Sequence, residues 1–168
     1  PADLPEGTGL FARLVADKGT SQLLFYNRST GALKVASGTD WKVTVLQGGD
    51  GKTDAGRYIG AAIGSDGTVH VAFSSNEGKL YYASYKGSVM MMPKAELIDD
   101  GVRAGDSHSV GAGAVLFLDG DKPVIAYQDA TSATLELARR DTMAWTKKTL
   151  AGAATVPRGY YPQAASFA

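Results

Sequence analysis

The stretch Ser65-Asp-Gly-Thr-Val-His-Val-Ala-Phe-Ser-Ser-Asn-Glu-Gly-Lys-Leu-Tyr-Tyr-Ala83 contains two runs of β-branched and aromatic residues. Asp66-Gly67 is a strong signal for a tight hairpin turn before the first run. Asn76-Glu-Gly78 predicts the turn that joins the two runs. Apolar runs separated by short glycine turns are typical of antiparallel strands. The stretch therefore predicts a β-hairpin within an all-β protein.

The same order of residue types recurs on both sides of this stretch. The upstream copy contains Gln22-Leu-Leu-Phe-Tyr26 and Leu33-Lys-Val-Ala36, and the downstream copy contains Val124-Ile-Ala-Tyr127 and Leu135-Glu-Leu-Ala138. Trp41 and Trp145 occupy one repeat position, Met92 replaces them in the middle copy, and Leu follows five residues later each time. Agreement at so many ordered positions predicts a structural repeat of about 50 residues.

Each copy predicts four strands, because a run rich in Gly and Ala precedes each aromatic run. Four antiparallel strands per repeat are typical of a β-propeller blade. We expect a single β-propeller portion over residues 1–168, with blades at about 9–50, 58–101 and 109–152. A single β-sandwich of about twelve strands is the alternative, and it would not require the repetition.

Three blades are too few to close a ring, since propellers typically have about four to eight. The segment Tyr161-Pro-Gln-Ala-Ala-Ser-Phe-Ala168 matches a blade opening, Tyr58-Ile-Gly-Ala-Ala-Ile63, so we expect residues 161–168 to form an extra first strand. Unpaired strand edges favour pairing with another chain. We expect the ring to be closed by a second copy, as a six-bladed homodimer, or by a partner chain that carries the remaining blades.

The composition excludes several classes of protein. Lys+Arg and Asp+Glu number 17 each, so we expect no nucleic-acid partner. The chain has no Cys, which excludes a disulfide scaffold and thiolate chemistry. No apolar run approaches the roughly 18 residues of a transmembrane helix, so we expect no membrane span.

Motifs for cofactor or nucleophilic chemistry are absent from the sequence. Gly48-Gly-Asp-Gly-Lys-Thr53 imitates the end of a phosphate loop, but Leu46 stands where the first glycine is required. A Gly-x-Ser-x-Gly elbow is missing, because Ile63 precedes the Ser65 motif in place of glycine. We therefore expect no enzymatic activity and no cofactor.

The repeats resemble exported bacterial β-propeller repeats related to the BNR and sialidase-type propellers. The resemblance rests on Ser65 to Phe73 with Gly78 to Ala83, and on Val124 to Asp129 with Leu135 to Ala138. It covers about residues 9–168, although the strict Asp-box Ser-x-Asp-x-Gly-x-Thr-Trp is missing from every copy. It implies a propeller fold and an extracellular or periplasmic location. A removed signal peptide would explain the start at Pro1, and proteolysis would explain it equally well.

The second and third strands are also similar to those of fucose-binding propeller lectins, in which short chains assemble into six-bladed rings and sugars bind between blades. This similarity implies ligand binding at the aromatic repeat positions and at arginines close to them. The candidates are Trp41, Trp145, Tyr26 and Tyr127, with Arg28 and Arg139 nearby. The arginine and glutamate that such sites use do not recur at one position in all three copies.

Packing offers a second explanation for these residues. Met92 replaces tryptophan in the middle copy, as a flexible apolar residue can in a core. Metal sites stay undetermined: His108 has one carboxylate two residues away, and the carboxylates of Asp99-Asp100 and Asp119-Gly-Asp121 lack the spacing of a calcium loop.

These observations predict a non-enzymatic ligand-binding or scaffolding β-propeller that self-assembles to close its ring. The first alternative is a carbohydrate-binding lectin, whose partner would be a glycan. The second is a fragment of a larger propeller enzyme such as a glycan hydrolase, whose site would need the missing blades.

Overall fold

The computed structural model describes residues 7–87 and 93–152, and their regular structure consists of strands alone. Sheet 1 contains β1 (Thr8–Asp17), β2 (Thr20–Asn27), β3 (Ala32–Ser37) and β4 (Lys42–Gly48). Sheet 2 contains β5 (Ala55–Ile63), β6 (Thr68–Ser75), β7 (Leu80–Lys86) and β8 (Glu96–Asp99). Sheet 3 contains β11 (Val110–Asp119), β12 (Lys122–Asp129), β13 (Thr134–Asp141) and β14 (Ala144–Ala151). The all-β prediction is confirmed.

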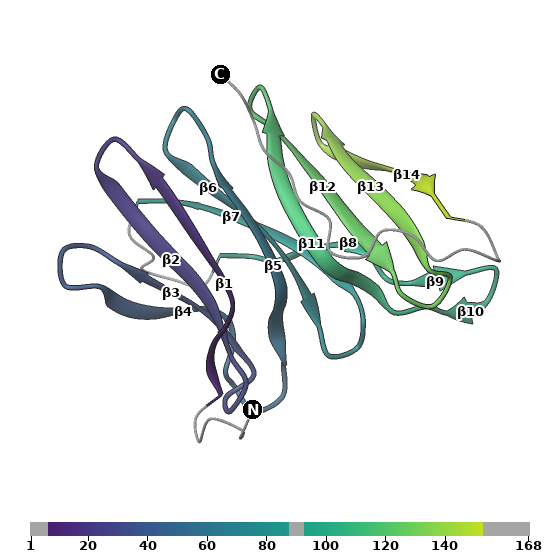
Figure 1. The fold of residues 1–168 in the computed structure, drawn as a ribbon, viewed down its shortest axis with the longest axis horizontal. Helices are drawn as coiled ribbons and strands as arrows, with labels where there is room; N and C mark the ends of the chain where they lie inside the picture. Colours follow the sequence, from purple (N-terminus) through teal and green to yellow (C-terminus); the bar gives the residue numbers. More distant parts are fainter. Residues whose placement is uncertain (1–6, 88–92, 153–168) are drawn as a thin grey trace.

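The sheets are simple antiparallel meanders in which each strand pairs with the next along the chain. Figure 1 shows sheets 1, 2 and 3 side by side in chain order. Between sheets 2 and 3 the chain forms a two-stranded ribbon, β9 (Val102–Arg103) with β10 (Asp106–Ser107). The described residues form no closed sheet, and they include no helix that could cross a membrane. Met92, which belongs to the repeat alignment, lies outside the described ranges. Residues 161–168, which were expected to form the extra strand, also lie outside them.

The core lies between the sheets rather than within one two-layer sandwich. One apolar cluster joins sheets 1 and 2 through residues such as Leu24, Leu33 and Phe73. A second cluster joins sheets 2 and 3 through residues such as Leu80 and Ile125. Because sheet 2 is covered on both faces, the two-sheet sandwich considered as an alternative is wrong. Each buried side chain of this size contributes roughly 1.5–3 kcal/mol to stability.

The first strand of each sheet carries two β-bulges at equivalent places, which confirms the repeat in three dimensions. Gly9, Gly56 and Gly111 occupy the equivalent bulge position with φ of 84°, 110° and 87°. A Cβ on Gly56 would lie 2.7 Å from the Cβ of Leu33 in the preceding sheet. Glycine is therefore needed both for the left-handed backbone and for the close approach of successive sheets.

The register corrects one alignment made from the sequence. Tyr26 pairs with Leu33, whereas Tyr127 pairs with Glu136, one position away from the residue that is equivalent to Leu33. The residue equivalent to Tyr127 in sheet 1 is therefore Phe25, not Tyr26. Side chains alternate between the faces of a strand, so Tyr26 and Tyr127 face opposite ways within their sheets. Tyr26 packs into the cluster between sheets 1 and 2, and Tyr127 packs into the cluster between sheets 2 and 3.

A second correction concerns the leucine of the repeat in β8. Ile98 is bulged out of the pairing between β7 and β8, as Leu46 is in the pairing between β3 and β4. Ile98 is buried, whereas Leu97, which the sequence alignment chose, is 48% exposed. The apolar residue of this repeat position is therefore Ile98.

Candidate functional site

Successive sheets are joined in the same way at two places, which we call the first junction (sheets 1 and 2) and the second junction (sheets 2 and 3). At the first, the Ala55 N–H donates a hydrogen bond to the Gly31 carbonyl at 3.0 Å. At the second, the Val110 N–H donates to the Gly78 carbonyl at 2.8 Å. Each first strand is thus anchored to the turn between the second and third strands of the preceding sheet. Equivalent residues of the two junctions can be compared directly.

The first junction contains a pocket of about 360 Å³. Its walls come from three places: the end of β4, the loop that leads into β5, and the β6–β7 hairpin. The lining includes Gln47, Asp54, Phe73, Asn76, Glu77 and Tyr81. Its volume falls within the range of small-molecule sites, roughly 300–1,000 Å³.

One wall of the pocket is aromatic. Phe73 and Tyr81 are directly paired across β6 and β7, so they lie on the same face of sheet 2. Their ring centroids are 5.7 Å apart and the rings are nearly parallel, at 14°. Phe73 is buried and Tyr81 is partly buried. The pair offers a fixed apolar surface to the pocket.

The opposite wall is polar and held by ionic contacts. The Asp54 carboxylate accepts a hydrogen bond from the Tyr26 hydroxyl at 2.7 Å and another from Arg57 Nη2 at 2.9 Å. Burial raises the pKa of Tyr26, and its hydrogen bond to Asp54 raises it further. Both carboxylate oxygens of Asp54 therefore have a donor, and its charge is balanced by Arg57.

The loop before Asp54 is shaped by its own side chains. Asp50 Oδ1 accepts hydrogen bonds from the backbone N–H groups of Lys52 and Thr53, at 2.9 and 2.6 Å. Such aspartate turns give hydrogen-bond partners to backbone N–H groups that are not paired with a neighbouring strand. Gln47, at the end of β4, donates its side-chain amide to the carbonyl of Pro93. These bonds fix the polar wall in place.

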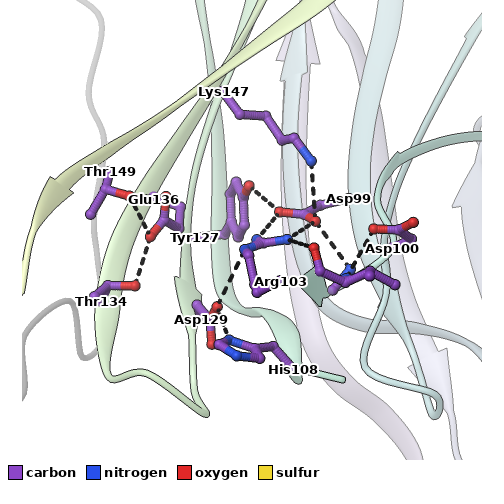
Figure 2. Close-up of polar contacts among 12 residues, drawn as sticks. Asp99, Asp100, Arg103, His108, Tyr127, Asp129, Thr134, Glu136, Lys147 and Thr149 are labelled. Carbon is purple, nitrogen blue, oxygen red and sulfur yellow. Dashed lines mark hydrogen bonds and ion pairs between the residues drawn. The ribbon is translucent and has the colours of Figure 1, made fainter. Parts of the chain in front are cut away.

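The second junction holds a charged network instead. Figure 2 shows Arg103, Tyr127 and Lys147 converging on Asp99, whose side chain is fully buried. Arg103 donates to both Asp99 oxygens, at 2.9 Å from Nη1 and 2.6 Å from Nη2. The Tyr127 hydroxyl donates at 2.7 Å, the Gly101 N–H at 3.1 Å, and Lys147 Nζ lies at 3.3 Å. Every lone pair that a carboxylate can offer is engaged.

The pKa of Asp99 reflects this environment. Burial by itself raises the pKa of a carboxyl group, because the charged form loses its hydration. Hydrogen bonds from Arg103, Tyr127 and the Gly101 N–H, together with the charge of Lys147, outweigh burial and lower the pKa. Asp99 is therefore ionised in the folded protein at neutral pH.

Asp129 extends the network toward the ribbon. His108 Nδ1 lies 2.7 Å from Asp129 Oδ2, and Arg103 Nε lies 3.8 Å from the same oxygen. The other oxygen, Oδ1, accepts the backbone N–H groups of Thr131 and Ser132, both at 3.0 Å. Burial raises the pKa of Asp129, but the hydrogen bonds from Ser132 and His108 lower it overall.

Glu136 stands in the second junction at the position of Tyr81 in the first. Both residues directly follow a leucine at or next to the start of the third strand, and both pair with an aromatic residue of the second strand. Glu136 is buried, and it accepts hydrogen bonds from Thr134 Oγ1 at 2.6 Å and Thr149 Oγ1 at 2.9 Å. The aromatic wall of the first junction has thus become a satisfied carboxylate (Figure 2).

The structure places the six sequence-predicted residues at separate sites. Tyr26 supports the first-junction pocket through Asp54, and Arg28 lies in the turn after β2. Tyr127 belongs to the second-junction network. Arg139 forms an ion pair with Asp119 at 2.8 Å near the opposite end of sheet 3.

The two tryptophans also differ in setting. Trp41 is 47% exposed and lies in the β3–β4 turn with a left-handed φ of 49°. Trp145 lies in β14 and packs edge-on against Tyr82 at 5.1 Å, with the Arg140 guanidinium 5.7 Å from its ring. The structure does not bring the six residues together, and a role in ligand binding stays a prediction for each of them.

The pocket-lining residues were missed by the sequence analysis. Gln47, Asp54 and Tyr81 do not recur as residue types at their repeat positions. The sequence signal available was their location: Gln47 at the end of a fourth strand, Asp54 just before a first strand, and Tyr81 at the start of a third strand. For metals, the described ranges contain no group of three or more His, Asp or Glu side chains that could hold an ion.

Comparisons with known proteins reveal a similarity of fold. No family model and no curated protein matches the chain. The SapL1 lectin in complex with α-methyl fucoside is similar with a TM-score of 0.58 and 17% identity, over 87% of this chain and 47% of SapL1. A mutant of AofleA from Arthrobotrys oligospora, with three arginines replaced by alanine, is similar with a TM-score of 0.51 and 17% identity, over 84% of this chain and 42% of AofleA.

This chain therefore spans less than half the length of either structure. At 17% identity the likeness establishes the fold alone. The chain shares the all-β architecture of a lectin-type structure.

Proposed function

We propose that the chain binds carbohydrate and that the pocket of the first junction is a sugar site. The observation that carries the proposal is the pairing, in one pocket, of an aromatic wall with a polar one. A sugar ring presents C–H groups on one face and hydroxyl groups around its edge. Tyr81 would pack against the C–H face, while Gln47, Asp54 and Asn76 would hydrogen-bond the hydroxyls.

Of the three charged residues that line the pocket, Lys52, Asp54 and Glu77, both carboxylates are paired with a cation, which suits a ligand without a strong positive charge, such as a neutral sugar. The carboxylate of Asp54 is neutralised by Arg57, and Glu77 forms an ion pair with Lys79 at 2.6 Å. The α-fucoside is the first ligand to test, because the SapL1 lectin was solved with α-methyl fucoside. Both oxygens of Asp54 are occupied by donors, which does not favour a proton-donating role in glycoside hydrolysis.

The direct test is a calorimetric titration of the chain with α-methyl fucoside, using two matched variants. Tyr81→Ala removes the aromatic wall and should weaken binding about tenfold or more, equal to about 1.4 kcal/mol. Tyr85→Ala removes a tyrosine from the same face of β7, whose hydroxyl bonds Gln22 outside the pocket. It should leave the affinity unchanged. Equal effects of the two variants, or no heat from the wild type with any neutral sugar of a glycan panel, would contradict the proposal.

We propose further that the three sheets are propeller blades and that a second copy closes the ring. Leu14, Leu23, Ala36 and Val43 form one cross-strand row on the face of sheet 1 that is turned away from sheet 2. The equivalent row of sheet 2, which includes Val71, is buried against sheet 1. Leu14 and Val43 are 64% and 52% exposed, as expected of a face that awaits another sheet.

Light scattering behind size exclusion tests this closure. A mass near twice 17.5 kDa supports a ring of two copies. A stable mass of 17.5 kDa at micromolar concentration would contradict closure by a second copy. The proposed location, outside the cytoplasm, follows from the exported repeats that the sequence resembles, and cell fractionation of the source organism tests it.

A further inference from the structure

The second junction has the frame of the first-junction pocket but different contents. Its equivalent positions follow from the strand register. Asp99 corresponds to Gln47, Asp129 to Ser75, Tyr127 to Phe73 and Glu136 to Tyr81. All four positions in the first junction line the pocket. The second junction therefore has the positions that would line a second pocket.

The Arg103 side chain lies among these positions. Its Nη2 is 2.6 Å from Asp99 and its Nε is 3.8 Å from Asp129. Tyr127 shares the Asp99 carboxylate with it. A guanidinium is planar and carries five N–H donors. It therefore satisfies at once several acceptors that would otherwise face an open pocket.

The ribbon β9–β10 delivers this guanidinium. Seven positions separate Gln47 from Asp54 in the first junction, but ten separate Asp99 from the equivalent Ser109 in the second. The extra length forms a hairpin closed by the His108 N–H bond to the Gly101 carbonyl at 2.8 Å. Its tip, Ala104-Gly105, has left-handed φ values of 51° and 97°, as in the two-residue turns that suit a hairpin.

We infer that the β9–β10 ribbon is a built-in plug, whose Arg103 occupies in the second junction the space that carbohydrate takes in the first. The inference rests on the proposed function of the first junction. It makes Arg103 the residue that limits how many sugars one chain binds. The closed junction differs from the open one by the three-residue extension, by Arg103 with its matching Asp99, and by Glu136 in place of an aromatic residue.

The test converts the second junction toward the chemistry of the first. In a Glu136→Tyr background, which restores the aromatic residue found at this position in the first junction, the double variant Asp99→Gln/Arg103→Ser removes the carboxylate and the guanidinium together, so that neither charge is left without the other. Lys147 is 41% exposed and can turn to water. In calorimetric titration with α-methyl fucoside, the number of sites per chain should rise by one. The control Arg13→Ser removes an exposed arginine of β1 and should leave the number unchanged.

A folded double variant that binds the wild-type number of sugars would overturn the plug. If the double variant does not fold, Arg103→Ser alone is titrated in the same way, with the same two outcomes. If neither wild type nor variant binds the fucoside, the proposed ligand has failed, and a crystal structure of the variant decides the plug separately. A second-junction pocket comparable in volume to the first supports it, and a filled junction overturns it.

Discussion

The two junctions of this molecule share a backbone plan and differ in what fills them. In the first, the loop into β5 is short, and a pocket lies between an aromatic wall and an ion-paired carboxylate. In the second, a longer loop carries Arg103 into the equivalent space and saturates Asp99. The strand repeat therefore creates equivalent positions in both junctions, whereas the inter-sheet loop and the side chains at these positions differ. Four predictions separate the two junctions.

The largest difference in stability between the junctions should come from the repeat position that Asp99 occupies in the second and Gln47 in the first. Asp99→Ala leaves Arg103 and Lys147 without their shared carboxylate, and breaking a buried ion pair costs about 3–5 kcal/mol. Gln47→Ala, at the equivalent place of the first junction, should cost about 1 kcal/mol. Urea unfolding followed by tryptophan fluorescence measures both. Equal losses would mean that the second junction does not depend on its network.

The glycines at the β-bulges provide a second comparison. Replacing Gly56 with alanine should lower the free energy of unfolding by about 2 kcal/mol. Gly56→Ala would place a Cβ 2.7 Å from Leu33 Cβ and 2.9 Å from its Cα, in addition to strain from the left-handed φ. Gly111→Ala would meet Ser74 Cβ at 3.0 Å and should cost somewhat less. The control Gly19→Ala also has a positive φ but open space around it, so it should cost about 1 kcal/mol. A Gly19 variant as unstable as the Gly56 variant would show that sheet contact contributes nothing.

Acidic pH should remove the stability that the ionised Asp99 carboxylate gives to the second junction. The folded-state pKa of Asp99 lies below its unfolded value of about 3.9. Its contribution is therefore complete above about pH 5 and is lost as the pH falls below about 4. The difference in unfolding free energy between wild type and Asp99→Asn should shrink by about 1–2 kcal/mol between neutral pH and pH 3. Urea unfolding across this range measures it, and a constant difference would contradict the assignment.

The smallest effect is expected at the first junction's own ion pair. Asp54 and Arg57 have side chains that are 24% and 39% exposed, so water and salt screen their attraction. Asp54→Asn should lower the free energy of unfolding by about 1 kcal/mol or less. The loss should become smaller still in about 0.5 M salt. A loss of unfolding free energy as large as that of Asp99→Ala, or a loss that does not change with salt concentration, would show that the two junctions are electrostatically alike.

Most of the fold could be predicted from the sequence because the repeat is carried by strand and turn residues. The alignment failed where residue type was matched instead of distance from the turn: four residues separate Asn27 from Ala32 and also Asp129 from Thr134, but Tyr26 lies one position before its turn pair and Tyr127 lies two. A shift of one position moves a side chain to the other face of its strand. Tyr26 and Tyr127 were matched by residue type, although this shift places them in different junctions.

The site could not be predicted, because its residues come from different sheets and differ between the copies. Tyr81 and Glu136 occupy one repeat position, with an aromatic wall in one junction and a buried carboxylate in the other. Arg103 lies in an extension that has no counterpart between sheets 1 and 2. Sequence repetition points to what the copies share, whereas the proposed function depends on how they differ.

The central claim is that the first junction binds a sugar. An amide-resolved NMR titration of the ¹⁵N-labelled chain with α-methyl fucoside tests it most directly, because it locates the ligand without any substitution. The account predicts chemical-shift changes concentrated at Gln47, Thr53, Asn76 and Tyr81, with Arg103 and its neighbours unaffected. Changes centred instead on the turns at Trp41 and Trp145, or on the second junction, would contradict it.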